Sequence, residues 1–557
     1  MESILRDVKS VRLSLNGINL IMEDNTLTEQ KVLPVNLCAS FVIEPLEDYL
    51  KYWSNEVGMD IQVSFAPYNQ VFQQLLDPNS LLNQSKGINF LFIRVEDWVR
   101  DQKSKPAVEQ IGFVTATYEP FIEAVKHASK KLLVPCVVGI VPLSPHHMLS
   151  LETATYIEEI NQKLDAFLKD VPGFHLLDLP GIAALYNTEQ MFDPKSDEIG
   201  HIPFTEEYFA ALGTYLVRKV RAYKTPAYKV IALDCDNTLW KGICGEDGAL
   251  HVVIDKEYTY LQQFLLEKYQ QGFVLVLCSK NNEADVWEVF DKHPGMQLKR
   301  EHIAAYRINW DPKPGNLASI AKELNLGLDS FIFLDDNPFE VEQVMLGYPE
   351  VFSILLPQES DASFDFLDHI WEFDVFQITE EDLQRNSMYI AEKQRKEEQT
   401  TYAHLDDFLQ SLAIKVNLRA LRMEDLDRAL QLTLRTNQFN MNGIRKTRED
   451  LLKSMDDNGA LNWIVDVEDR FGDYGSVGVV LAKSVENKLL IDTFLLSCRV
   501  LGRKVEDFIL SELQQYRLSN QLHSIEARFC PTSKNQPFAE FMARNQLTVY
   551  KEKIHQF

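Results

Sequence analysis

The sequence predicts an α/β protein of three domains with a helical linker. Up to about residue 379, short and almost wholly apolar runs alternate with helix-length amphipathic stretches, which is the pattern of parallel sheets covered by helices. The last part of the chain carries strand-like runs in succession, followed by a helix, and this predicts an α+β domain. A chain of 557 residues exceeds one hydrophobic core, so several domains are expected.

The first domain, residues 1–225, is predicted from apolar runs separated by helical patterns. Four runs have the character of buried strands: Lys31–Ala39, Asn89–Val95, Leu132–Val141 and Phe174–Leu179. Helical patterns lie between and after these runs, as in PLEDYLKYW and in Thr153–Val171. The domain is therefore expected to be a layered α/β structure.

The second domain, residues 226–379, alternates most regularly. Its strand candidates are Val230–Leu233, Phe273–Cys278, Phe331–Leu334 and Val351–Leu355. Its helix candidates are Lys256–Tyr269, Glu283–Lys292, Pro314–Leu324 and Pro338–Leu346. Strands that alternate with helices predict βαβ units and a parallel sheet.

The linker, residues 380–403, contains the charged stretch EEDLQRNSMYIAEKQRKEEQ and is expected to be a solvated helix. In the third domain, residues 404–557, the Gly-containing turn DRFGDYG predicts antiparallel pairing of the first two strands. The predicted elements are a helix at Leu426–Arg435, strands at Trp463–Val467, Val477–Ala482 and Leu489–Leu495, a helix at Lys504–Tyr516 and a strand at Ser524–Phe529.

Charge and cysteine content narrow the class of protein. The formal charge of −26 argues against non-specific binding to nucleic acid or to an anionic membrane, because both need a basic surface. No apolar run is long enough to span a bilayer, and the start, MESILRDVKS, lacks a signal-peptide pattern. Seven cysteines without CxxC pairs fit free thiols in a reduced compartment. We therefore expect a cytoplasmic protein.

The stretch VIALDCDNTLWKGICGEDG, from residue 230 to 248, carries the strongest chemical signal. An apolar strand ends in Asp234 and Asp236, and the carboxyl edge of an open α/β sheet is where ligands bind. Two carboxylates one residue apart can act as nucleophile and metal ligand and as acid or base, respectively. A bare pair of this kind is also compatible with an ordinary turn.

Three further motifs supply groups suited to a phosphoryl site. Ser279 and Lys280 lie at the end of the next strand, in CSKN, where a hydroxyl can donate to a phosphoryl oxygen. Lys313, in WDPKPGN, can neutralise charge on the phosphoryl group and on the nucleophilic carboxylate. Two acids follow the strand FIFL and complete an oxygen-rich Mg²⁺ site. The metal set is Asp234, Asp236 through its backbone carbonyl, Asp335 and Asp336.

This order of motifs resembles that of the haloacid dehalogenase (HAD) phosphotransferases, whose domain is a Rossmannoid parallel sheet. The resemblance implies that Asp234 is the nucleophile that forms an aspartyl-phosphate and that Asp236 is the general acid/base. It also implies that Lys313 stabilises charge and that Asp335 or Asp336 binds Mg²⁺ directly, a choice that the sequence leaves open. The implied phosphate-binding residues are Asn237, Thr238, Ser279 and Lys280.

Longer motifs narrow the resemblance to the FkbH-like family of HAD proteins (HAD-IIIC phosphatases). They are LDCDNTLWKGICGEDG, CSKNNEADVWEVFDKHPGM, RINWDPKPGN and FLDDNPFEVEQV in the second domain, and RTNQFNMNGIR, DRFGDYGSVGVV and LLSCRVLGRKVED in the third. Lys241, in the loop that covers the site, stands where the family pattern has a small residue. The resemblance implies a phosphatase and glyceryl transferase of polyketide biosynthesis. Such a protein removes the phosphates of 1,3-bisphosphoglycerate and loads a glyceryl unit onto the phosphopantetheine thiol of an acyl carrier protein.

Cys235 lies between the two acids and is a candidate carrier of a glyceryl thioester. Against this role, free cysteine often packs as a small apolar residue, and strand alternation points its side chain away from Asp234 and Asp236. Carboxylates would raise the pKa of its thiol, an effect that Lys313 and Mg²⁺ would oppose. Cys244, in the covering loop, is the second candidate.

The third domain resembles the GNAT acetyltransferase fold. The resemblance implies a pantetheine-binding site at Arg499, Gly502 and Arg503, where glycine and basic residues suit the approach of a phosphate. Polar residues expected to line this site are Ser497, Cys498, Asn437 and Gln438.

The first domain resembles the SGNH hydrolases less clearly, because Ser40 lacks the usual Gly-Asp before it. The resemblance implies a hydrolase set of Ser40, Asp197 and His201. The alternative is a scaffold domain in which Ser40 caps a turn and His201 is hydrogen-bonded.

The sequence thus predicts an Mg²⁺-dependent phosphatase coupled to glyceryl transfer, with no nucleic-acid or membrane partner. Two alternatives stay open. One is a phosphatase that acts on another phosphorylated metabolite without acyl transfer. The other is an adaptor that binds a carrier protein and whose chemistry is vestigial.

Overall fold

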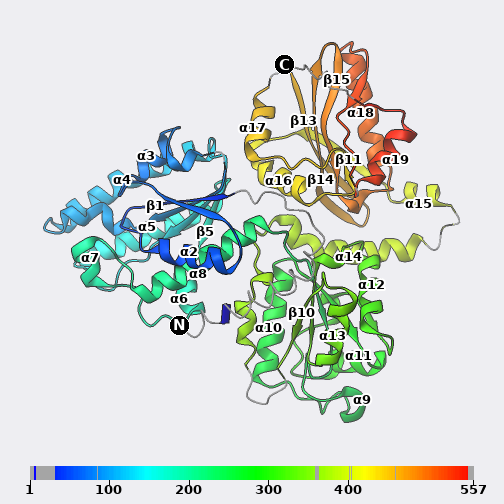
Figure 1. Ribbon diagram of the computed structural model, residues 1–557, viewed down its shortest axis with the longest axis horizontal. Coiled ribbons are helices and arrows are strands. Elements are labelled where there is room, and N and C mark those ends of the chain that lie inside the picture. Colours follow the sequence, from blue (N-terminus) through cyan, green and yellow to red (C-terminus); the bar gives the residue numbers. More distant parts are fainter. Residues whose placement is uncertain are drawn as a thin grey trace. The chain divides into compact units, whose positions relative to one another are not determined.

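The computed structural model describes residues 6–7, 32–84, 86–357, 363–399, 402, 404–457, 459–532 and 534–549. Most of the first ten residues, and residues 400, 401 and 403 of the predicted linker, lie outside these ranges. The chain divides into two compact units, Met1–Ile378 and Thr379–Phe557. Figure 1 labels their helices and strands. Among the described residues, no helix combines the length and the apolar character needed to cross a membrane.

The first sheet of unit one is parallel and has the strand order β2-β1-β3-β4-β5. Its strands are β1 (Leu33–Ala39), β2 (Ile61–Phe65), β3 (Ile88–Ile93), β4 (Cys136–Ile140) and β5 (Phe174–Leu177). The accompanying helices are α2 (Leu46–Glu56), α3 (Val71–Leu76), α4 (Ala107–Ser129), α5 (Leu151–Lys169), α6 (Leu179–Leu185), α7 (Pro194–Gly200) and α8 (Glu206–Lys224). The predicted α/β layering is confirmed, whereas β2 was not predicted.

Alternation along the strands gives this sheet two apolar faces. Phe90 and Phe92 of β3 pack in the core that includes α2 and α8, whereas Leu91 packs in the core that includes α4 and α5. The chain order reverses between β1 and β3. The carboxyl ends of these two strands therefore border a topological switch point, where open sheets bind ligands.

The second sheet is also parallel and has the order β10-β9-β6-β7-β8. Its strands are β6 (Val230–Leu233), β7 (Val274–Ser279), β8 (Ile303–Ile308), β9 (Phe331–Asp335) and β10 (Phe352–Leu355). Its helices are α9 (Cys244–Asp247), α10 (Lys256–Gln270), α11 (Glu283–Lys292), α12 (Lys313–Leu324) and α13 (Pro338–Gly347). The predicted parallel sheet of βαβ units is confirmed, with β8 as an additional strand. Its switch point lies between β6 and β9.

A short segment joins the cores of these two sheets. It contains the 3₁₀ turns η6 (Phe364–His369) and η7 (Trp371–Phe373). Trp371 packs against Trp53 of the first core with ring centroids 5.0 Å apart, and Phe373 packs against Phe264 of the second core, also at 5.0 Å. The next residue, Asp374, accepts two hydrogen bonds from Arg218 of α8, at 2.8 and 2.7 Å.

Unit two is built on a mixed sheet in the order β11-β13-β14-β15-β16-β17, with β12 paired to β15. The strands are β11 (Lys415–Ala420), β12 (Phe439–Asn440), β13 (Ala460–Asp469), β14 (Gly472–Val485), β15 (Lys488–Leu496), β16 (Ile525–Ala527) and β17 (Thr548–Val549). The helices are α14 (Glu380–Gln399), α15 (Leu405–Ser411), α16 (Leu426–Arg435), α17 (Arg448–Asp456), α18 (Val505–Ser519) and α19 (Gln536–Arg544). The expected antiparallel strands are β13, β14 and β15.

Helix α14 corresponds to the predicted linker, but one side of it is packed rather than solvated. It lies against β14, and Met388, Ala391 and Arg395 are buried. Apolar packing and an ion pair both hold this side of the helix, because Arg395 donates two hydrogen bonds of 2.8 Å to the buried Asp469.

Candidate active site

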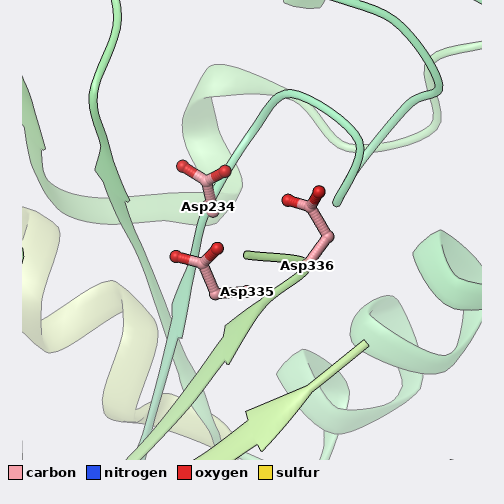
Figure 2. Close-up of side chains that lie close together, drawn as sticks. All are labelled: Asp234, Asp335 and Asp336. Atoms are coloured by element: carbon pink, nitrogen blue, oxygen red, sulfur yellow. The ribbon is translucent and has the colours of Figure 1, made fainter. Parts of the chain in front are cut away.

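Three carboxylates meet at the switch point of the second sheet (Figure 2). Asp234 follows β6, Asp335 ends β9 and Asp336 follows it. One oxygen from each lies within 4.8 Å of the others, and all three residues are buried. The Asp234 amide donates to the Leu334 carbonyl at 3.1 Å, which ties the two strand ends together. Carboxylate oxygens gathered in this way suit a hard cation such as Mg²⁺.

Lys313, the first residue of α12, brings a positive charge to this cluster. Its Nζ lies 2.8 Å from Asp234 Oδ1 and 2.5 Å from Asp335 Oδ2. Burial alone would lower the pKa of Lys313, but the two carboxylates outweigh burial and raise it. Burial, reinforced by Asp234, raises the pKa of Asp335 to about 7 although Lys313 opposes the shift. Three acids and one lysine leave an excess of negative charge that a divalent cation would compensate.

The Asp236 side chain is bound by its own loop and by the end of β7. Its Oδ1 accepts hydrogen bonds from the Trp240 indole at 2.8 Å and from the Cys244 amide at 3.0 Å. Its Oδ2 accepts from the Asn281 side chain at 2.7 Å. Asp236 is not part of the side-chain cluster that could bind a metal. Among the described residues, this cluster consists of Asp234, Asp335 and Asp336. To act on a leaving group, Asp236 must exchange these donors for the substrate.

The four residues predicted to bind phosphate have different surroundings. Thr238 is buried and donates to Asp336 Oδ1 at 3.4 Å, and Ser279 is buried at the end of β7. Asn237 has a left-handed backbone, φ 55°, and its side chain accepts from the Gly242 amide at 2.9 Å, so it shapes the covering loop. Lys280 pairs with Glu340 of α13, with Nζ 2.7 Å from Oε1.

The two candidate thiols are both buried. Burial, followed by the charge of Asp234, raises the pKa of Cys235 well above its usual value, and Ser279 only partly offsets this. Burial and Asp236 raise the pKa of Cys244 to about 12. Both thiols are thus protonated at neutral pH, which disfavours a nucleophilic role in this conformation. Lys241, the departure from the family pattern, is exposed and pairs with Val253 through the backbone.

The arginines predicted to bind pantetheine have partners within unit two. Arg499 Nη1 lies 2.8 Å from Met388 Sδ, and Arg503 Nη2 lies 2.6 Å from Glu392 Oε2. Gly502 has φ 75°, a conformation that suits glycine. Both arginines therefore contact α14.

The other polar residues predicted near that site lie before β12 and after β15, two strands that pair with each other through Phe439 and Leu496. Ser497 caps the 3₁₀ turn η9 (Cys498–Val500), at which Cys498 is half-buried. Asn437 and Gln438 are exposed, and the Asn437 side chain accepts from Arg445 at 2.6 Å.

In the first domain the structure brings Ser40 and His201 together on Asp97, which corrects the proposed set with Asp197. Ser40 Oγ donates to Asp97 Oδ2 at 2.7 Å, and His201 Nε2 lies 2.8 Å from Asp97 Oδ1. Asp197 instead pairs with Arg94 and Arg100, at 2.7 and 2.9 Å. His201 lies close to Asp197 in the sequence, but the Asp197 side chain contacts the two arginines. Ser40 has no hydrogen bond to His201, so a Ser-His-Asp relay is not formed.

Sequence reasoning missed three residues that shape the site: Trp240, Asn281 and Glu340. Asn281 had a usable signal, because it directly follows CSK at the same sheet edge as Ser279. Trp240 lies only four residues after its partner Asp236, so its contact is local. Glu340 gave no local signal, because it meets Lys280 only through the strand order.

Comparisons with known proteins agree with a phosphatase fold. No family model matches the chain, and its sequence matches no curated protein. Among solved structures, the N-terminal part of a Bacteroides fragilis protein, which contains a phosphatase domain complexed with Mg, is 25% identical. It covers 62% of this chain and 94% of its own, with a TM-score of 0.51.

Two acetyltransferase structures resemble a smaller share of the chain. One, an N-acetyltransferase from Thermoplasma acidophilum in complex with coenzyme A, is 15% identical and covers 24% of this chain and 88% of its own, with a TM-score of 0.19. The other is an aminoglycoside acetyltransferase from an uncultured soil sample in complex with sisomicin. It is 13% identical and covers 28% of this chain and 97% of its own, with a TM-score of 0.20. These two likenesses do not assign a role to any residue of this chain.

Proposed function

We propose that this chain is an Mg²⁺-dependent phosphatase of the HAD type that also transfers a glyceryl unit to an acyl carrier protein in polyketide biosynthesis. The observation that carries the phosphatase function is the buried group of Asp234, Asp335 and Asp336 with Lys313 bound to two of them. A nucleophilic carboxylate, a cation and an acidic metal set are the parts that phosphoryl transfer needs.

In the proposed reaction Asp234 attacks phosphorus and the bond to the leaving oxygen breaks. Asp236 gives its proton to that oxygen, and Lys313 lowers the repulsion between the phosphoryl group and the Asp234 carboxylate. Asp236 then takes a proton from water, whose oxygen attacks the aspartyl-phosphate, releases phosphate and restores Asp234. Thr238 and Ser279 would donate to phosphoryl oxygens.

The residues that would hold Mg²⁺ are Asp234, Asp335 and Asp336, with the backbone carbonyl of Asp236. The fit rests on the donor set, since the raised pKa of Asp335 reflects buried negative charge without full compensation. Bound there, the ion would supply Lewis-acid stabilisation of charge on the phosphoryl oxygens.

The proposed substrate is 1,3-bisphosphoglycerate. Its C1 acyl phosphate is activated, so the thiolate of a carrier's phosphopantetheine arm can attack that carbonyl, forming a C–S bond as the C–O bond to phosphate breaks. The C3 phosphate ester is not activated and needs the Asp234 site. Arg499, Gly502 and Arg503 are proposed to receive the pantetheine arm, which would require Arg503 to leave Glu392.

The test combines the protein, Mg²⁺, 1,3-bisphosphoglycerate and a holo carrier protein, with phosphate release and the intact mass of the carrier as readouts. We expect a glyceryl mass shift on the carrier and release of the C3 phosphate that Asp234→Asn abolishes. An unchanged rate in Asp234→Asn would overturn the proposal.

A phosphatase without acyl transfer is the second candidate, favoured over a route through a Cys235 thioester by the complete burial of Cys235. In that case phosphate is released while the carrier mass stays unchanged. Cys235→Ala then has no effect on carrier loading, because there is none, and intact mass detects no acylated protein. An adaptor with vestigial chemistry would instead bind the carrier and release no phosphate.

A further inference from the structure

An ion pair spans the carboxyl end of the strand that carries Asp234. Lys280 follows β7, and Glu340 lies in the first turn of α13, which follows β9. In the sheet, β6 separates β7 from β9. Because neighbouring strands lie about 4.8 Å apart, the two side chains reach across the end of β6 to make their contact. Nζ and Oε1 are 2.7 Å apart.

The two partners differ in burial. The Glu340 side chain is 8% exposed and its Oε2 has no hydrogen-bond partner, whereas Lys280 is 31% exposed. The carboxylate is therefore fixed, while the lysine, a flexible chain with three donors, can turn to another anion. Lys313 cannot do so, because its side chain is 3% exposed and lies between two carboxylates.

We infer that Lys280 is a specificity-determining residue that binds a second anionic group of the substrate, instead of the transferred phosphoryl group that the resemblance implied, and that Glu340 holds the ammonium until the second group arrives. This inference rests on the proposed phosphatase function of Asp234. A phosphoryl group seated on Asp234 lies at the end of β6, so a carboxylate or phosphate a few bonds away falls within the span of Lys280. The substrate class is thus a short-chain phosphate ester with a second anion.

Glu340 gives the pair its selectivity. A substrate with a single anionic group offers nothing to replace the Glu340 carboxylate, so Lys280 stays bound to it. A second anion competes with Glu340 and gains a charge-assisted hydrogen bond. Removing Lys280 and removing the charge of Glu340 should therefore have opposite effects on the binding of a doubly anionic substrate.

The experiment compares 3-phosphoglycerate with glycerol 3-phosphate in the presence of Mg²⁺. These esters share a three-carbon skeleton and a terminal phosphate, and differ in a carboxylate against a hydroxymethyl group. Lys280→Met should raise KM for 3-phosphoglycerate about tenfold, the loss expected for one charge-assisted contact, and leave KM for glycerol 3-phosphate within about twofold. Glu340→Gln should lower KM for 3-phosphoglycerate. In both variants kcat should change little.

The matched control is Lys292→Met, which breaks the Lys292–Glu288 pair of α11, also 2.7 Å long but remote from the strand ends. It should change neither KM. Lys280→Met leaves the Glu340 carboxylate buried without a partner. The double variant Lys280→Met/Glu340→Gln removes both charges and avoids this problem. It should distinguish 3-phosphoglycerate from glycerol 3-phosphate as poorly as Lys280→Met does.

A second readout needs no turnover. In the Asp234→Asn background, calorimetric titration with 3-phosphoglycerate should show about tenfold weaker binding when Lys280 is also replaced. If the ratio of the two KM values is the same in wild type, Lys280→Met and the double variant, the inference is wrong. If neither ester releases phosphate, or Asp234→Asn releases it at the wild-type rate, the proposed phosphatase function fails instead.

Discussion

Unit one contains two parallel sheets whose switch points carry opposite kinds of polar cluster. Between β1 and β3, Arg94 and Arg100 meet the acids Glu96, Asp97 and Asp197, so positive and negative groups largely cancel inside the protein. Between β6 and β9, three acids face one lysine.

The difference shows that a switch point brings polar side chains together, and that the balance of their charges decides whether they can bind a cation. The first cluster uses its acids to bind its own arginines and His201, and Ser40 donates into the same network. The second retains negative charge for a cation. On this basis we predict that the first cluster stabilises the fold and that the second binds a ligand.

The largest expected effect comes from removing the nucleophile. Asp234→Asn should lower the rate of phosphate release by about a thousandfold or more, because Asp234 is the proposed nucleophile that forms the phospho-enzyme. The control is Ser40→Ala, which should stay within about twofold of the wild type. Loss of phosphate release in Ser40→Ala would abolish the distinction between the two clusters.

The next effect is on stability and belongs to the first cluster. Arg94 is 3% exposed, and Arg94→Met would remove the cation that pairs with Glu96 and Asp97, whereas Asp197 would keep Arg100. Breaking a buried pair in this way costs about 3–5 kcal/mol in the free energy of unfolding, measurable by urea denaturation. Phosphate release per folded molecule should not change. Lys126→Met, which removes an exposed pair with Glu123, should cost far less.

Metal binding should stabilise through the second cluster. At a Mg²⁺ concentration of about one hundred times its Kd, linkage gives about 2.7 kcal/mol. Tm should therefore rise with Mg²⁺ in the wild type and in Asp97→Asn, and should rise much less in Asp336→Asn. An equal rise in all three proteins would place the cation elsewhere.

The smallest effect is a pH dependence in the absence of metal. Since the pKa of Asp335 is about 7 in the folded chain and about 3.9 in an unfolded one, the folded state holds the extra proton between these values. Stability should then fall as pH rises from about 4 to about 7. In EDTA, the Tm of the wild type should fall relative to the Tm of Asp335→Asn over this pH range, and Mg²⁺ should reverse the trend. A Tm difference between the two proteins that does not change with pH would contradict the raised pKa of Asp335.

Much of the second domain could be predicted because its signals are local. The apolar run Val230–Leu233 is β6 as expected, and parallel strands place their carboxyl ends on one edge, which was enough to group Asp234 with Asp335. The strand β8 escaped prediction because its sequence IAAYRI is not a continuous apolar run and includes the half-buried Arg307.

What could not be predicted depends on contacts between distant parts of the chain. Asp97 and His201 are 104 residues apart, and nothing in either neighbourhood singles out the other. The same holds for Lys280 and Glu340, whose encounter follows from strand order. Roles assigned by resemblance, such as those of Arg499 and Arg503, remain predictions.

The segment from η6 to Asp374 has a consequence for dissecting the protein. Trp371 packs in the core of the first sheet and Phe373 packs in the core of the second. This one segment therefore completes both hydrophobic cores. A fragment beginning near residue 226 would leave Asp374 without Arg218 and would expose the Trp371 ring to water. The two sheets should therefore melt in a single calorimetric transition, and the smallest fragment that retains phosphatase activity should include the N-terminal sheet.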